Sequence, residues 1–168
     1  MIGHTFRCGI GLSLLVLAPC SACATPPVAG SLCEASQTAY FSCRTARHKT
    51  ISLCGALPSA LQYRYGKAGH LELAFPDDAA QGAQRFAYAH YSRYQVERSE
   101  ISFSHGTADY TLFDYTEDGR RTAGVQVGTA DGKAAEIRCA GVIQGALSPL
   151  GKRLRCDADS ALDGGHCP

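Results

Sequence analysis

The segment from Glu100 to Arg120, EISFSHGTADYTLFDYTEDGR, decides the fold class. Ile101 and Phe103 alternate with polar residues, so one face of this run is apolar and the other is polar, which is typical of a half-buried β-strand. A second run rich in β-formers covers residues 110–116. The small polar residues between the runs, and the Asp-Gly pair after the second run, are turn signals. The segment therefore predicts two strands connected by a loop and followed by a tight turn.

Similar short runs of β-formers lie on both sides of this segment. They are Ala39–Thr45, Thr50–Ala56, Leu61–Tyr65, His70–Phe75, Arg85–Ser92, Tyr94–Arg98, Gly124–Gly128 and Glu136–Ala140. Together the runs predict about eight strands at roughly ten-residue spacing, which is the pattern of a barrel or sandwich. Residues 142–155 could form a helical turn or two, interrupted by Pro149. We expect an all-β domain over residues 33–156, a single antiparallel barrel or sandwich stabilised by disulfides.

The first 24 residues have the features of a secretory signal peptide. Arg7 precedes an apolar stretch at 10–18, and small residues including Ala22 and Ala24 end the segment. The apolar stretch is too short to cross a bilayer, so no membrane span is expected. A lipid anchor at Cys23 or Cys20 is the alternative to simple cleavage. The prediction is a periplasmic or secreted protein, or an outer-membrane lipoprotein, with residues 25–32 as a flexible lead-in.

The cysteines support export to an oxidising compartment. Three of the nine cysteines lie in the signal segment, which leaves six: Cys33, Cys43, Cys54, Cys139, Cys156 and Cys167. Up to three disulfides are expected, and the spacing does not choose among their connectivities. We expect one bridge to connect the N-terminal hairpin to the late strand at Cys139, and Cys156 and Cys167 to hold the tail 157–168. A zinc site is the rival interpretation, but no two of these cysteines have the C-x-x-C spacing.

Composition and charge exclude several function classes. The chain has 168 residues and a formal net charge of +1, which supports one domain and no electrostatic footprint for nucleic acid or anionic lipid. We find no nucleophile elbow, zinc-protease, phosphate-loop or dinucleotide motif. The sequence therefore predicts a non-enzymatic protein without a cofactor. Two weak alternatives are paired acids at Asp114 and Glu117 for hydrolysis, and a calcium loop at Asp157, Asp159 and Asp163.

Two surface features are candidates for partner binding. Arg85, Arg93 and Arg98 are interleaved with tyrosines at 88, 91 and 94, and such residues are enriched in binding hot spots, so they could form one aromatic and basic face. The loop from Ser104 to Asp109 has the small polar composition of an exposed recognition tip.

Parts of the sequence resemble known exported proteins. The segments 41–54 (FSC followed by KTISLC), 61–66 (LQYRYG) and 71–76 (LELAFP) resemble an uncharacterised family of small exported proteins of Gram-negative bacteria. More distantly, the aromatic residues before Cys43 and the overall layout are similar to the periplasmic and membrane-bound lysozyme inhibitors. That resemblance implies a small disulfide-stabilised β-barrel, sometimes lipid-anchored, whose S-G-x-x-Y loop enters the lysozyme cleft.

The resemblance places a partner-binding site at Ser104, His105, Gly106 and Tyr110. His105 separates Ser104 from Gly106, and Tyr110 comes later than in the inhibitor motif. The expected function is inhibition of a peptidoglycan hydrolase, as a periplasmic inhibitor or an immunity protein. The alternative is an envelope structural or stress-related module with no single protein target.

Overall fold

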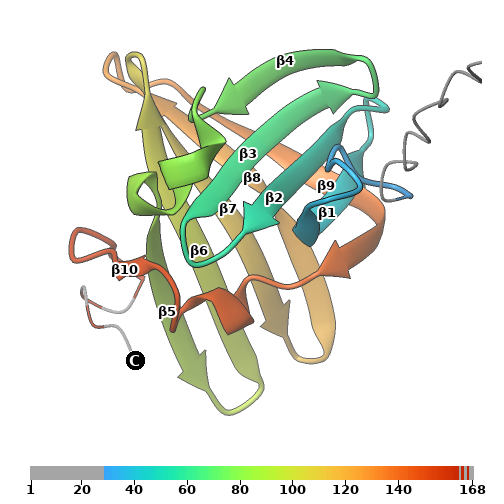
Figure 1. Ribbon diagram of the computed structural model, residues 1–168. Helices are drawn as coiled ribbons and strands as arrows, with labels where there is room; N and C mark the ends of the chain where they lie inside the picture. The colour runs from blue at the N-terminus through green and yellow to red at the C-terminus, as the bar shows by residue number, and fades with distance from the viewer. Residues whose placement is uncertain (1–28, 163, 165, 167–168) are drawn as a thin grey trace, which may run out of the picture.

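The computed structural model describes residues 29–162, 164 and 166, which form a single sheet with two short 3-10 helices (Figure 1). The predicted signal peptide and Cys167 lie outside the described residues. The strands are β1 (Thr38–Thr45), β2 (Thr50–Ala56), β3 (Ala60–Lys67), β4 (His70–Phe75), β5 (Ala87–Arg93), β6 (Val96–His105), β7 (Ala108–Glu117), β8 (Arg120–Thr129), β9 (Ala134–Gly145) and β10 (Arg155–Cys156). The helices are η1 (Ala79–Arg85) and η2 (Ser148–Leu150).

The prediction of an all-β domain is confirmed, with two corrections to its detail. The described residues form ten strands, in the order β10-β5-β6-β7-β8-β9-β1-β2-β3-β4. Every neighbouring pair is antiparallel except β10 with β5, which makes the sheet mixed. The sheet curls into a half-barrel whose end strands, β4 and β10, do not pair with each other. The predicted single antiparallel barrel or sandwich of about eight strands therefore differs from the structure in its strand count and in the closure and strand direction of the barrel.

One strand boundary also differs from the sequence prediction. The runs at 94–98 and 100–104 were predicted as separate strands, but both belong largely to β6. Tyr94 and Gln95 form the turn between β5 and β6, because Arg93 pairs directly with Val96. Gln95 has a φ of 58°, a left-handed conformation that ends a strand.

The core lies on the concave face of the curled sheet, between β2–β3 and β6–β8 (Figure 1). Phe103 of β6 is at the centre of an aromatic cluster. Its ring stacks on Phe75 at 4.7 Å and on Tyr110 at 4.9 Å, and it contacts Phe86 and Tyr63 at 5.3 and 5.1 Å. The cluster joins β3 and β4 to β6 and β7, which are distant in the order of the sheet. It therefore holds the two sides of the half-barrel together.

Two connecting segments cover the ends of the core. In η1, Gly82 packs so closely on β3 that an added Cβ would lie 1.8 Å from the Leu61 carbonyl oxygen. After β9, Leu147 and the η2 residue Leu150 are buried in the core. Helix η1 therefore packs on β3, and the segment of η2 closes the core after β9.

Two disulfides are present among the described residues. Cys33 is bonded to Cys54, and Cys43 is bonded to Cys139. The second bond connects β1 to β9, so the predicted bridge from the N-terminal hairpin to Cys139 is confirmed. The two bonds are interleaved along the chain, since each encloses one cysteine of the other. Such bonds are typical of proteins of oxidising compartments.

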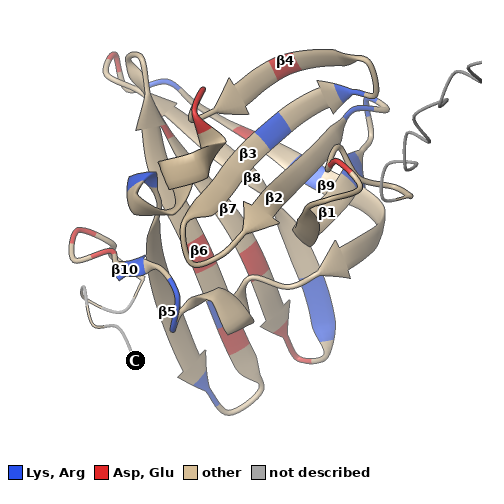
Figure 2. Cartoon of the chain, in the orientation of Figure 1, with Lys and Arg blue, Asp and Glu red and all other residues tan. Residues whose placement is uncertain are grey.

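The segment before β1 crosses the outer face of β1 and β2. The Leu32 backbone N–H donates to Ser52 Oγ at 3.0 Å, and Ser42 Oγ donates to the Gly30 carbonyl oxygen at 2.9 Å. With the Cys33–Cys54 disulfide, these bonds attach residues 30–33 to the sheet. Figure 2 shows residues of both charge signs interspersed along the strands and turns, in agreement with the near-neutral composition.

Candidate functional site

The predicted recognition loop is shorter in the structure than the sequence suggested. β6 continues to His105 and β7 begins at Ala108, so Ser104 and Asp109 lie in strands. Gly106 and Thr107 form the whole turn, which we call the β6–β7 turn. Gly106 has a φ of 62°, and nothing lies within 4 Å of an added Cβ. The turn is a tight, exposed hairpin tip and not a long loop.

The predicted site residues separate onto two faces of this hairpin. Ser104 Oγ donates to Asp109 Oδ1 at 2.6 Å across the outer face of the hairpin. Tyr110 is half-buried and stacks on Phe103 with 4° between the ring planes, so it belongs to the core wall. His105 is exposed, and its ring lies edge-on to Phe75 at 5.5 Å. Only His105 and Gly106 of the four predicted residues are at the tip, with Ser104 one residue below.

Sequence reasoning missed the groups that the fold brings beside His105. A hollow of about 470 Å³ is lined by His105, by the end of β4 and by η1. In this hollow, which we call the Phe75 hollow, the Arg85 guanidinium lies 5.5 Å from the Phe75 ring. Asp77 and Asp78 also line it. An imidazole and a guanidinium therefore flank one buried ring, with two carboxylates nearby.

A second hollow lies on the outer face of the same hairpin. It has a volume of about 570 Å³ and is bordered by β6, β7 and the chain at 155–161. Ser102 Oγ donates to Asp157, which attaches that chain segment to β6. Arg85 lines this hollow as well as the Phe75 hollow, so its side chain connects the two. The β6–β7 turn thus projects beside two polar depressions.

The predicted aromatic and basic face does not form as one surface. Tyr88 is buried, with its hydroxyl 3.1 Å from Ser99 Oγ, and Arg85 lies in η1, before the start of β5. Tyr94 is at the β5–β6 turn and is 85% exposed. Arg98 is paired with Glu117 at 2.5 Å on the outer face. Alternation along β5 sends Tyr88 to the opposite face from Tyr91 and Arg93, whereas Tyr91 pairs in register with Arg98 of β6.

The predicted acidic sites are used differently. Asp114 is buried and accepts two hydrogen bonds from Arg121, at 2.7 and 2.9 Å. Glu117 is paired with Arg98, so these two carboxylates do not face a common site. Within residues 29–162, 164 and 166, no three His, Cys, Asp or Glu residues gather as metal ligands. Asp163 of the calcium prediction lies outside the described residues.

Several groups of the sheet have shifted pKa values, and none of them is one of the four predicted site residues. A hydrogen bond with His90 lowers the pKa of the Glu97 carboxyl, and the two side chains are 2.5 Å apart. Burial raises the pKa of the Tyr88 hydroxyl. Burial also raises the pKa of Tyr63, which packs in the aromatic cluster. The two tyrosine shifts report burial in the half-barrel interior, and the Glu97 shift reports its hydrogen bond at the start of β6.

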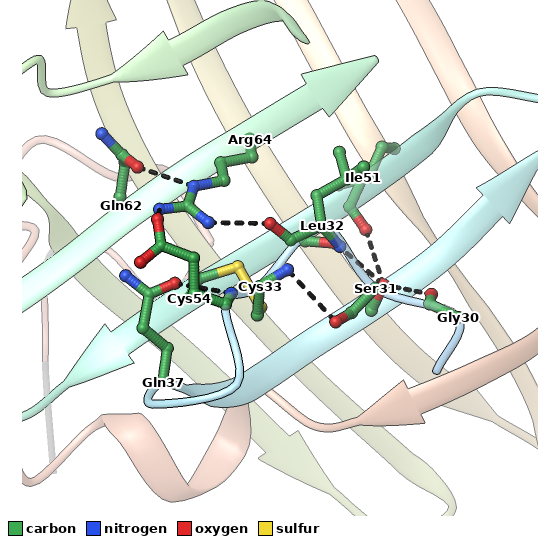
Figure 3. Close-up of a disulfide and its surroundings, with 12 residues drawn as sticks. Gly30, Ser31, Leu32, Cys33, Gln37, Ile51, Cys54, Gln62 and Arg64 are labelled. Atoms are coloured by element: carbon green, nitrogen blue, oxygen red, sulfur yellow. Dashed lines mark hydrogen bonds and ion pairs between the residues drawn. A yellow bond between two sulfur atoms is a disulfide. The ribbon is translucent and has the colours of Figure 1, made fainter. Parts of the chain in front are cut away.

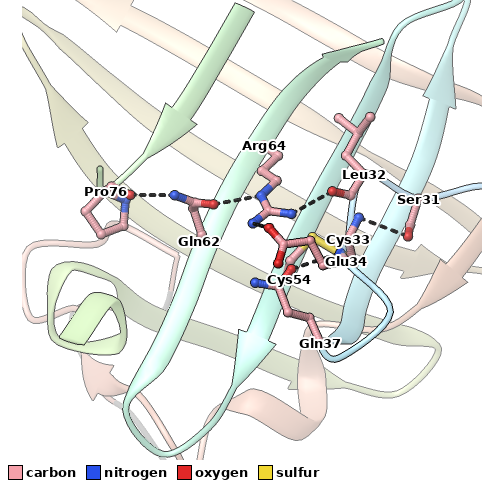
Figure 4. A network of polar contacts seen from close by, with 9 residues as sticks. All are labelled: Ser31, Leu32, Cys33, Glu34, Gln37, Cys54, Gln62, Arg64 and Pro76. Atoms are coloured by element: carbon pink, nitrogen blue, oxygen red, sulfur yellow. Dashed lines mark hydrogen bonds and ion pairs between the residues drawn. A yellow bond between two sulfur atoms is a disulfide. The ribbon is translucent and has the colours of Figure 1, made fainter. Parts of the chain in front are cut away.

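A buried arginine beside the first disulfide is the other feature that the sequence did not predict. Arg64 projects from the outer face of β3, and its guanidinium donates to the Leu32 carbonyl oxygen, Gln62 and Glu34 (Figure 4). Figure 3 shows the Cys33–Cys54 bond directly beside this network. A groove of about 580 Å³ runs next to it, and we call it the Arg64 groove. Alternation along β3 places the Arg64 side chain on the outer face and therefore predicts that it is exposed. The segment that covers it contains Leu32 and Glu34, about thirty residues earlier in the chain, so the local pattern does not reveal the cover.

Comparison with known proteins assigns neither a family nor a function to the chain. No family model, no curated protein and no solved structure matches the chain. None of the helices formed by the described residues is long and apolar enough to cross a membrane.

Proposed function

We propose that this chain is an exported, non-enzymatic binding protein that inhibits a peptidoglycan hydrolase by occupying its cleft with the β6–β7 turn. The main support for the proposal is an exposed hairpin tip whose base is held by contacts on both faces of the hairpin. His105, Gly106 and Thr107 are exposed. Directly below them, Ser104 is hydrogen-bonded to Asp109 and Tyr110 is stacked on Phe103.

A braced tip is suited to inhibition because it loses little conformational entropy when it enters a cleft. The two-residue turn is narrow, and the neighbouring Arg85 offers a second donor beside His105. Arginine and aromatic side chains dominate many protein interfaces. Two disulfides and the predicted signal peptide support a periplasmic location, where cell-wall hydrolases act.

The test uses protein expressed from the full chain and purified with its disulfides formed. Clearing of a peptidoglycan suspension is measured with a lysozyme, a lytic transglycosylase and an amidase, each titrated with the protein. We expect one of these hydrolases to lose activity at an equimolar ratio. The His105→Ala variant should weaken that inhibition about tenfold or more, the effect of removing a hot-spot side chain.

Tyr94→Ala is the matched control, because Tyr94 is an exposed ring at the opposite end of β6. Equal inhibition by wild type and His105→Ala would contradict the assignment of the turn. If none of the three hydrolases is inhibited, the proposal fails and the envelope module becomes the better interpretation.

A further inference from the structure

The Arg64 groove has the size and composition of a small-ligand site. Its volume of about 580 Å³ is within the range of such sites, and its surface is mostly apolar. Leu71 forms one wall and is 45% exposed, so its side chain offers apolar area to a ligand. Ala74 beside it is small, which leaves room above the outer face of β4.

Arg64 supplies a buried positive charge in this apolar groove. The residue is only 6% exposed. Its Nε donates to Gln62 Oε1 at 2.7 Å and its Nη1 donates to the Leu32 carbonyl oxygen at 2.7 Å. A guanidinium has five N–H groups, and the described residues supply three acceptors. Arg64 can therefore bind a further carboxylate without giving up its two shorter hydrogen bonds.

The third acceptor is itself a carboxylate, and its position is informative. Glu34 Oε1 lies 3.2 Å from Arg64 Nη2, the longest of the three contacts, and the Glu34 side chain is 69% exposed. An ion pair with so exposed a partner contributes little to stability. Glu34 thus occupies the position that a ligand carboxylate would take, and it can move into water at small cost. Lys67 adds a second cation to the lining of the groove.

We propose that the Arg64 groove binds a long-chain carboxylate of the fatty-acid class. The head group replaces Glu34 on the Arg64 guanidinium, and the alkyl chain lies against Leu71 and Ala74. A neutral alkyl chain would not use the arginine, and a short carboxylate would leave the apolar wall in water. The groove shares no lining residue with the Phe75 hollow, so this site does not depend on the proposed inhibition.

The test is calorimetric titration of the intact protein with decanoate, decan-1-ol and acetate. We expect decanoate to bind and the other two probes to bind at least tenfold more weakly. Glu34→Ala should tighten decanoate binding about two- to fivefold, because the competing internal carboxylate is gone. Leu71→Ser should weaken it several-fold through lost apolar contact.

Asp131→Ala is the matched control, since it removes an exposed carboxylate from the β8–β9 turn. It should leave decanoate binding unchanged. The proposal is overturned if decanoate does not bind, if decan-1-ol binds equally well, or if Glu34→Ala behaves like Asp131→Ala. Unchanged thermal unfolding of the Glu34 and Leu71 variants, both exposed positions, separates these outcomes from misfolding.

Discussion

Replacement of Asp114 by alanine should destabilise the protein by about 3 kcal/mol. The buried Asp114 carboxylate accepts two hydrogen bonds from Arg121 and a third, at 3.1 Å, from the Leu147 backbone N–H. Without the carboxylate, the buried Leu147 N–H has lost its acceptor, which costs about 1–3 kcal/mol. The Arg121 side chain is 33% exposed, so water partly replaces its partner and the ion pair adds only about 1 kcal/mol.

Urea unfolding followed by circular dichroism measures this loss. For a chain of this length, about 3 kcal/mol also corresponds to a fall of about 6–12 °C in the thermal midpoint. Asp114→Asn should cost less, because the amide oxygen can still accept from Leu147. Asp131→Ala, which removes an exposed carboxylate, should change stability by less than about 0.5 kcal/mol. A loss below about 1 kcal/mol for Asp114→Ala would refute the argument that this carboxylate fastens the segment after β9 to β7.

Three further perturbations test the fold. Joint replacement of Cys43 and Cys139 by alanine should lower the free energy of unfolding in urea by about 4–5 kcal/mol, because that disulfide closes a separation of 96 residues. The Cys33–Cys54 disulfide closes a separation of only 21 residues, so its removal should cost less. A larger loss for Cys33–Cys54 than for Cys43–Cys139 would contradict the estimate. Gly82→Ala should cost about 2–3 kcal/mol because the new methyl meets a β3 carbonyl, and an unchanged thermal midpoint would show that η1 shifts freely. The lowered pKa of Glu97 adds stability above its ordinary value of 4.5 that is lost as the pH falls through the folded value. Glu97→Gln should therefore flatten the acid side of the stability profile measured from pH 3 to 6, and a profile parallel to wild type would contradict this.

The strands were predictable from sequence because their signal is local. The alternation at Ile101 and Phe103 shows which face of β6 is buried, and both residues lie in the core. The alternation of apolar and polar residues was misleading at Tyr94, because it continues through the turn that Tyr94 forms with Gln95. The left-handed backbone at Gln95 ends the strand, and periodicity does not report it.

The site required information that no local pattern contains. The Phe75 hollow combines β4, η1 and the tip of β6, which meet only when the sheet curls. Arg64 follows the inward-facing Tyr63 and should point to water, yet the Cys33–Cys54 bond holds the N-terminal segment over it. His105 and Gly106 were placed correctly at an exposed tip. Tyr110 lies in β7, as its run of β-formers predicted, but no local pattern reveals that it stacks on Phe103 of the preceding strand.

The interleaved disulfides have a consequence for how the protein is made. Cysteines that appear in the order 33, 43, 54 and 139 are first able to bond to their nearest neighbours, and neither native bond connects consecutive cysteines of this series. Early oxidation of the emerging chain would thus trap a Cys33–Cys43 or Cys43–Cys54 bond. Thiol–disulfide exchange must then release Cys43 until Cys139 arrives. Production of the native protein should accordingly depend on a disulfide isomerase or a redox buffer, and an oxidant alone should yield scrambled chains.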